Sequence, residues 1–310
     1  MGGSNPMRSS IKTVLDRYQV RKTPKQKEAF RTFLNTHAKK HEYEVSIQKY
    51  SKKGHNLIIG SPASAKLILT AHYDTPPNFF IPIVASVGGI VPWTLSQFIP
   101  LIPLLAILSI PRLLIKNPLA SAIASEAFLI AYAIQIVAGI PNKHNANDNT
   151  SGVAVLLSLL EDLPHELREK ICFVFFDDEE KGLIGANKFK KAYGSQVAHK
   201  PLINFDCVAH GSHFVFSAKK AFRNSQESDS LEESLAALLH HKDYSYGSAL
   251  KHIYTSDQLL FKNSVGVAAA HKLPLVGPVL NRIHTRQDNK FDEGNIEVLK
   301  TLIMDFTSKL

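Results

Sequence analysis

Apolar and polar residues follow one another along most of the chain in an order that predicts alternating strands and helices. Apolar residues recur at helical spacing from Thr23 and Pro24 to about Lys40, with a threonine cap and a proline in the first turn. Three strands are expected next, in YEVSIQKY, HNLIIGS and AKLILTAHYD, and a capped helix in TSGVAVLLSLLEDL. This order is typical of an α/β domain.

The second half of the chain continues the alternation. KICFVFF predicts a fully buried strand and GLIGANKFKKAY a helix, and PLINFDCVAHG and GVAAAHK predict two strands with a helix near 229–241 between them. The final DEGNIEVLKTLIMDFTSKL has helical spacing. Because several strands are apolar throughout, we expect a mixed, largely parallel sheet with helices on both faces, whose ligands bind beyond the carboxyl ends of the strands.

The segment 79–140 does not follow this alternation. Its first 33 residues contain no charge and five prolines, and residues 119–140 contain one charge, Glu126. Each stretch is long enough to cross a hydrocarbon core of about 30 Å, so the pair predicts a membrane hairpin. A hydrophobic helical lid or a dimer interface is the alternative, and the prolines count against a single straight span in the first stretch.

This segment divides the chain. We assign 23–78 and 141–310 to one α/β domain, 79–140 to an inserted hydrophobic helical segment, and 1–22 to an N-terminal extension that is partly a cloning remnant. The polar residues 1–30 contain no export signal, and basic residues are frequent before the insert. The positive-inside rule then predicts a cell-membrane protein whose α/β domain faces the cytoplasm, or a soluble cytoplasmic protein if the insert does not enter the membrane.

Composition narrows the class of partner. The chain has 310 residues, 45% of them hydrophobic, and a net charge of +9, which permits an anionic partner. The basic residues are scattered, however, and no zinc-finger, helix-turn-helix or RNA-recognition signature occurs, so nucleic acid is not expected as a partner. Cys172 and Cys207 lie in or beside apolar strands and are expected to be buried thiols. None of these features predicts the oligomeric state.

The sequence FVFFDDEEKGLIG places four consecutive acids directly after an apolar strand. These acids repel one another and need a positive charge opposite them, unless they form only a solvated turn. The candidates for a shared site at the strand ends are His72, Asp74, Asp148, Glu179, Glu180, Asp206 and His284. Two imidazoles with several carboxylates suit a pair of divalent ions, and the histidines favour zinc.

Five blocks carrying these residues occur in an order that resembles peptidase family M28, the co-catalytic zinc aminopeptidases. The blocks are His-x-Asp in LTAHYDT, NDNTSG, FDDEEKGLIG, NFD and HTRQD, and the resemblance covers residues 55–310 apart from the apolar insert. It implies a phosphorylase/hydrolase-like fold, two zinc ions per chain, and hydrolysis by a metal-bridging water.

Matching the blocks residue by residue implies which side chains bind the metals. His72 and Asp206 would bind one metal, and Glu180 and His284 the other. Asp148 would bridge the two ions.

The same match implies the roles of the remaining candidates. Asp74 would orient His72 through its ring N–H, and Glu179 would be the general base. Asp177 and Asp178 are expected to be structural, although Asp178 stands where the family commonly has glycine. In TSDQLLF, where the family often has Ser-Asp-His, Asp257 is a candidate contact for the substrate's free α-amino group or a support of the fold.

The resemblance therefore implies a zinc-dependent aminopeptidase that hydrolyses peptide bonds near the N-terminus of peptides. The alternatives are a glutaminyl cyclase-like acyltransferase with a single zinc, a membrane adaptor that retains the fold, and a carboxypeptidase or amidohydrolase of the same clan. The complete set of ligands and base favours hydrolysis. Since the apolar insert lies between His72 and Asp148, we also expect an apolar or membrane-delivered peptide substrate.

Overall fold

The computed structural model describes residues 7–79, 83–99, 101–238, 242–274 and 276–310. Its strands are β1 (Val45–Lys49), β2 (His55–Ile59), β3 (Leu67–His72), β4 (Val84–Ser86), β5 (Ile171–Phe176), β6 (Leu202–Phe205), β7 (His213–Ala218), β8 (Asp243–Ser248), β9 (Ser264–Leu273) and β10 (Gly277–Asn281). Its α-helices are α1 (Ser9–Arg17), α2 (Pro24–Lys40), α3 (Ile90–Gln97), α4 (Leu101–Leu114), α5 (Pro118–Ala138), α6 (Thr150–Asp162), α7 (His165–Arg168), α8 (Ile184–Val197), α9 (Lys220–Arg223), α10 (Gln226–Leu238) and α11 (Glu293–Ser308). Two 3₁₀ turns are η1 (Glu179–Lys181) and η2 (Asp257–Leu260).

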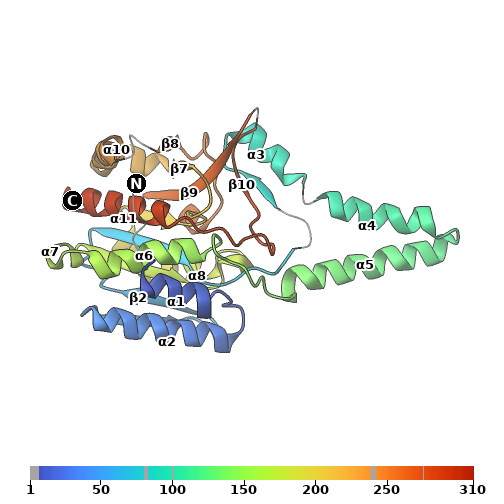
Figure 1. Cartoon of the computed structure of the whole chain (residues 1–310), viewed down its shortest axis with the longest axis horizontal. Coiled ribbons are helices and arrows are strands. Elements are labelled where there is room, and N and C mark those ends of the chain that lie inside the picture. The colour runs from blue at the N-terminus through green and yellow to red at the C-terminus, as the bar shows by residue number, and fades with distance from the viewer. Residues whose placement is uncertain (1–6, 80–82, 100, 239–241, 275) are drawn as a thin grey trace.

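The strands form one ten-stranded mixed sheet, which confirms the predicted α/β class (Figure 1). Neighbouring strands follow the order β1-β2-β5-β3-β6-β9-β10-β4, and β7 pairs with both β9 and β8. The central strands β5, β3, β6 and β9 are parallel, whereas β1, β2, β10 and β4 add antiparallel pairs at the two sides. The carboxyl ends of the parallel strands β3, β5 and β6 therefore meet at one edge of the sheet.

Alternating side chains of the strands belong to two hydrophobic cores, one on each face of the sheet. In β2, Leu57 and Ile59 join the core formed with α1, α2, α6 and α11, while Ile58 between them joins the core formed with α8. This period of two is the geometry of an extended strand. Every residue of β3 and β5 is buried, because helices cover both faces of these central strands.

The N-terminal segment is packed more closely than the assignment of 1–22 to an extension suggests. Residues 1–6 lie outside the described residues, but α1 packs against α6, with Ile11 and Val14 fully buried. Arg21 is also completely buried, and it donates a hydrogen bond to the Tyr73 carbonyl just after β3. Residues 7–22 therefore belong to the domain, because their apolar and cationic side chains complete its core.

The apolar segment 79–140 is not helical throughout, although residues 80–82 and 100 lie outside the described residues. Its residues Val84–Ser86 form β4, which pairs with β10 and so extends the sheet. The rest of the first apolar stretch is divided between α3 and α4, and the second stretch forms α5. Only α5 is long and apolar enough to cross a membrane among the described residues. Figure 1 shows α4 and α5 side by side, projecting from the body of the domain.

Candidate metal centre

Loops at the carboxyl edge of the sheet place the predicted residues together. His72 ends β3, Glu179 and Glu180 follow β5 in η1, and Asp206 follows β6. Asp148 comes from the loop before α6, and His284 from the loop after β10. The candidates therefore come from segments far apart in sequence that share one edge of the sheet.

The NDNTSG segment is held against β6 by its own polar groups. The Asn149 side chain accepts a hydrogen bond from the Gly152 N–H, which caps α6, and its Nδ2 donates to the Phe205 carbonyl, both at 2.9 Å. A Cβ at Gly152 would approach the Phe205 oxygen to 2.2 Å. The glycine is thus required by the close contact between α6 and β6, which brings Asp148 to the strand ends.

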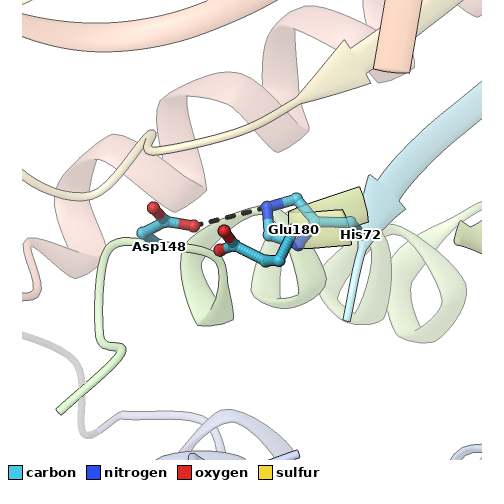
Figure 2. A group of neighbouring side chains, drawn as sticks. All are labelled: His72, Asp148 and Glu180. Carbon is cyan, nitrogen blue, oxygen red and sulfur yellow. Dashed lines mark ion pairs between the residues drawn. The ribbon is translucent and has the colours of Figure 1, made fainter. Parts of the chain in front are cut away.

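Asp148 lies between the two histidines. Its Oδ1 is 3.3 Å from His72 Nε2, and its Oδ2 is 3.0 Å from His284 Nε2. Asp206 Oδ1 lies 3.7 Å from His72 Nε2, and Glu180 Oε2 lies 3.5 Å from His284 Nε2. Each carboxylate oxygen of Asp148 therefore faces one histidine, and each of these histidines also lies near one further acid. Figure 2 shows His72, Asp148 and Glu180 pointing toward a common space.

Asp74 contacts both the first histidine and the acid run. Its Oδ1 is 3.5 Å from His72 Nδ1, consistent with the predicted orientation of that ring. The same carboxylate accepts hydrogen bonds from the backbone N–H groups of Glu179 (3.0 Å) and Glu180 (3.2 Å). Asp74 thus fixes the position of η1 as well as the imidazole, a contact that the sequence pattern does not reveal.

The charges of the site favour a cation. Burial and the charge of Asp148 raise the pKa of Glu180 well above its ordinary value, and burial together with neighbouring carboxylates does the same for Glu179. For Asp148, burial opposes ionisation, but the hydrogen bonds from His284 and His72 hold its pKa below the usual range. The buried Glu180 Oε1 and Asp206 Oδ1 have no hydrogen-bond partner among the described residues.

These observations fit divalent metal ions. Carboxylates buried together are costly unless positive charge compensates them, and His and Asp/Glu side chains are the donors that zinc prefers. A metal ion would use the two unpaired carboxylate oxygens as coordinating atoms. The residues present therefore suit the predicted metal centre.

The first two acids of the run have a different role from Glu179 and Glu180. Asp177 and Asp178 form ion pairs with the buried Lys27 of α2, as the structural role predicted for them requires. Asp178 has a left-handed backbone (φ 57°), the conformation that glycine adopts most easily. Its carboxylate accepts hydrogen bonds from Lys27 Nζ (2.7 Å), Tyr50 Oη (3.0 Å) and Lys181 Nζ (2.8 Å). These contacts stabilise the turn that leads into Glu179.

Two supporting residues were not predicted from the sequence. Asp288 accepts hydrogen bonds from the backbone N–H groups of Asn147 (2.8 Å) and Asp148 (3.0 Å), which fixes the loop that carries Asp148. The sequence did contain a signal for Asp288, because this residue is the aspartate of the HTRQD block. Arg21 donates to the Tyr73 carbonyl and to Thr150 Oγ1, and burial lowers its pKa to about 10. No local pattern distinguishes Arg21 from other basic residues.

Asp257, the candidate contact for a substrate amino group, is completely buried in η2. It does not line the cavity beside the metal ligands, so the structure does not place it in contact with a substrate. Burial raises its pKa well above the ordinary value, and it faces the charges of His72, Asp74 and Asp206. Its neighbour Tyr254 does line the cavity and donates a hydrogen bond to the Asp206 carbonyl at 2.9 Å.

A cavity of about 280 Å³ opens beside these ligands. One side carries the acids and histidines of the centre, and another is apolar. Part of the apolar wall comes from the insert, through Val84, Val87 and Trp93 of the β4–α3 region. Leu280 and Ile283 complete it. The insert therefore shapes the space in which a ligand of the centre would bind.

Comparison with known proteins relates this geometry to a family. The model for Peptidase family M28 matches residues 134–306, which include Asp148, Glu179, Glu180, Asp206 and His284. No curated protein sequence matches the chain.

Solved structures share the fold at low identity. A glutaminyl cyclase from Porphyromonas gingivalis is 17% identical, with 97% of each chain covered and a TM-score of 0.60. A Zn-dependent exopeptidase from Parabacteroides distasonis is 14% identical, with 96% of each chain covered and a TM-score of 0.58. A glutaminyl cyclase from Fimbriiglobus ruber is 14% identical, with 100% of this chain and 98% of that chain covered and a TM-score of 0.61.

These structures establish the fold, and the family model identifies the group within it. The match covers more than half of the chain and contains Asp148 together with the acid run. The match to this family supports a metallopeptidase, which is a hydrolase. The type of coordinating side chains in the centre supports zinc as the metal. The chain belongs to peptidase family M28.

Proposed function

We propose that the protein is a dinuclear zinc aminopeptidase. The observation that carries this proposal is the position of Asp148, whose two oxygens lie 3.3 Å and 3.0 Å from Nε2 of two different histidines. Since a further acid accompanies each histidine, the residues form two donor sets that share one carboxylate. His72 and Asp206 would hold one ion, and His284 and Glu180 the other.

When bound, two divalent cations at these positions would polarise the scissile carbonyl and lower the pKa of a water molecule. Glu179 lines the same cavity, and burial raises the pKa of its carboxyl. A carboxylate in this position can act as a general base toward a water molecule in the cavity. Glu179 accepts the proton of the attacking water and donates it to the leaving amine. Asp74 keeps the Glu179 backbone in place during both transfers.

The cavity supports cleavage after an N-terminal residue with an apolar side chain. Its acidic side would attract a free α-amino group, while its apolar side would accept a hydrophobic side chain. A volume of about 280 Å³ suits one residue rather than an extended peptide. We therefore propose peptides that begin with an apolar residue as substrates.

The test combines metal content with hydrolysis by wild type and Glu179→Gln. We expect two zinc ions per chain and cleavage only of peptides with a free amino terminus. The Gln variant should keep both metals and lose about 10²- to 10⁴-fold in kcat/KM, the usual contribution of a general base. The exposed α2 residue Glu28 provides the matched control, and Glu28→Gln should leave kcat/KM unchanged.

Other outcomes would overturn the proposal. A single zinc per chain with cyclisation of N-terminal glutamine would indicate a cyclase-like acyltransferase. Hydrolysis that is unchanged in Glu179→Gln would remove Glu179 from the role of base. Equal cleavage of N-blocked peptides would exclude recognition of the amino terminus.

A further inference from the structure

The α4–α5 hairpin (Leu101–Leu114 and Pro118–Ala138) carries a continuous apolar outer surface. Large side chains on it are mostly exposed, among them Leu105 (61%), Leu113 (82%) and Phe128 (59%). Figure 1 shows the hairpin extending well away from the domain, so the domain does not cover this surface. Apolar surface of this extent is unusual in contact with water and indicates that something else covers it.

The packing of the first turns of α5 is the reverse of that in a water-soluble helical pair, whereas α4 turns larger side chains such as Leu104 and Leu108 inward. The polar side chains of Ser121 (3% exposed) and Ser125 (4% exposed) are buried where α5 packs on α4, one helical turn apart. The larger Ile123, Phe128 and Ile134 are exposed instead. In water, large apolar residues face the partner helix. In lipid, small residues face the partner helix, because acyl chains accommodate the large ones.

The outward face of α5 is apolar from Leu119 to Ile134 except at Glu126, which is also exposed. Leu119, Ile123, Ile130 and Ile134 are each exposed by more than half, and Glu126 is the one charged residue in the helix. A helix that lies flat on a membrane surface would carry a polar face instead. The 21 residues of α5 extend for about 31 Å at 1.5 Å per residue, close to the ~30 Å of a hydrocarbon core.

Cationic residues are found at both ends of the apolar hairpin. Arg112 and Lys116 lie at the turn between the helices, and Lys143 is exposed just after α5 returns to the domain. Two levels of positive charge separated by an apolar length match the two phosphate layers of a bilayer.

We propose that the α4–α5 hairpin is inserted in a lipid bilayer and that the domain lies against one surface of that bilayer. The inference rests on the packing, length and charge of the hairpin, and it does not depend on the proposed peptidase activity. A partner protein would cover one side of the hairpin, whereas lipid surrounds the exposed surfaces of both helices.

Insertion would place the metal centre near the lipid surface, because the base of the hairpin contacts a ligand. Gln135 Nε2 of α5 donates to the Asn78 carbonyl at 2.8 Å. The next residue, Phe79, donates its N–H to the His284 carbonyl at 2.7 Å, and the two rings lie 5.3 Å apart. This last consequence rests on the proposed function: a peptide whose amino terminus emerges from the membrane would reach the cavity over a short distance.

The test is flotation of the full chain with vesicles of phosphatidylcholine and phosphatidylglycerol. Wild type is compared with a variant that carries both Ile123→Lys and Ile130→Lys, two substitutions on the outward face of α5. The matched control is Ile47→Lys, because Ile47 is also exposed (53%) but lies on the edge strand β1. We expect wild type and the control to float, and the vesicle-bound fraction of the double variant to fall at least tenfold with an unchanged unfolding midpoint.

A second measurement keeps the test decisive if the double variant misfolds. Hydrogen exchange of wild type should slow in residues 118–138 when vesicles are added, because lipid excludes water from α5. Wild type that stays in the dense fraction, or a folded double variant that floats like wild type, would overturn the proposal. Self-association without flotation, lost in the double variant, would instead show that a second copy of the chain covers the hairpin.

Discussion

At the residue scale, one buried lysine explains how four consecutive acids can follow β5. Lys27 pairs with Asp177 and Asp178, and those contacts leave Glu179 and Glu180 free to face the centre. The pair is nearly inaccessible to water, since the Lys27 side chain is 4% exposed and that of Asp177 is completely buried. Removing one partner would leave the other charge buried without compensation.

The substitution Lys27→Met tests this pair. We expect the free energy of unfolding to fall by about 3–5 kcal/mol, the usual cost of leaving a buried charge unpaired. Urea unfolding at pH 7 measures the change. Lys25→Met is the matched control, because Lys25 lies on the same helix and is exposed. Equal stability of the two variants would contradict the role given to Lys27.

At the element scale, local signals predicted some helices and strands but not others. The cap of α2 was predicted, and the structure confirms it: the Thr23 side chain accepts from the Gln26 N–H, and Gln26 reciprocates. The strands β7, β8, β10 and β4 were not predicted. Three of them are short or partly exposed, and β4 and β8 pair with strands that are distant in sequence. Strand formation there depends on tertiary pairing rather than on a local pattern.

The N-terminal helix is attached to the domain by charges as well as apolar contacts. Arg8 forms a two-pronged pair with Asp162 at the end of α6 (2.8 and 2.6 Å) and also contacts Glu297 of α11 (3.0 Å). Lys300 contacts the same Asp162 at 2.6 Å. Burial opposes ionisation of Asp162, but hydrogen bonds from Arg8 and Lys300 lower its pKa.

This lowered pKa predicts how stability depends on pH. Because folding favours ionised Asp162, its contribution is complete above the unfolded pKa of about 4 and is lost as pH falls through the lower folded pKa. Arg8→Gln should therefore destabilise the protein by about 1 kcal/mol at pH 7, a value reduced for solvent screening, and by less near pH 3.

Urea unfolding at pH 7, 5 and 3 measures this difference. Lys12→Gln is the control, because the Lys12–Asp16 pair is more than half exposed and contributes little. A difference between wild type and Arg8→Gln that grows toward acidic pH would contradict the predicted sign.

At the scale of the whole molecule, the candidate metal centre joins parts of the fold that are far apart in sequence. Its ligands come from the ends of β3, β5 and β6 and from the loops before α6 and after β10. A metal that binds only the folded arrangement stabilises the whole domain through mass action. Because these residues are far apart in sequence, the residues next to each one predict its role only weakly. The order of all five blocks along the chain predicts it better.

Removal of metal should therefore lower thermal stability. We expect a chelator to reduce the free energy of unfolding by about 3 kcal/mol, the effect of losing a ligand present at roughly 100 times its Kd. Calorimetry before and after chelation, with metal content measured in parallel, gives the change. The chelator should have much less effect on His284→Ala. Unchanged stability after verified metal loss would contradict a shared metal centre.

The sequence by itself determined the α/β class, the cap of α2 and the residues that the centre brings together. These features depend on local periodicity, capping chemistry and the type and order of donor residues, all of which are present along the chain. Only the tertiary structure placed Arg21 and Lys27 beneath the site, and Asp257 outside the cavity. It also divided the apolar insert into a strand, a short helix and a projecting hairpin. Those features depend on burial and on pairing between distant segments, which no short stretch of sequence contains.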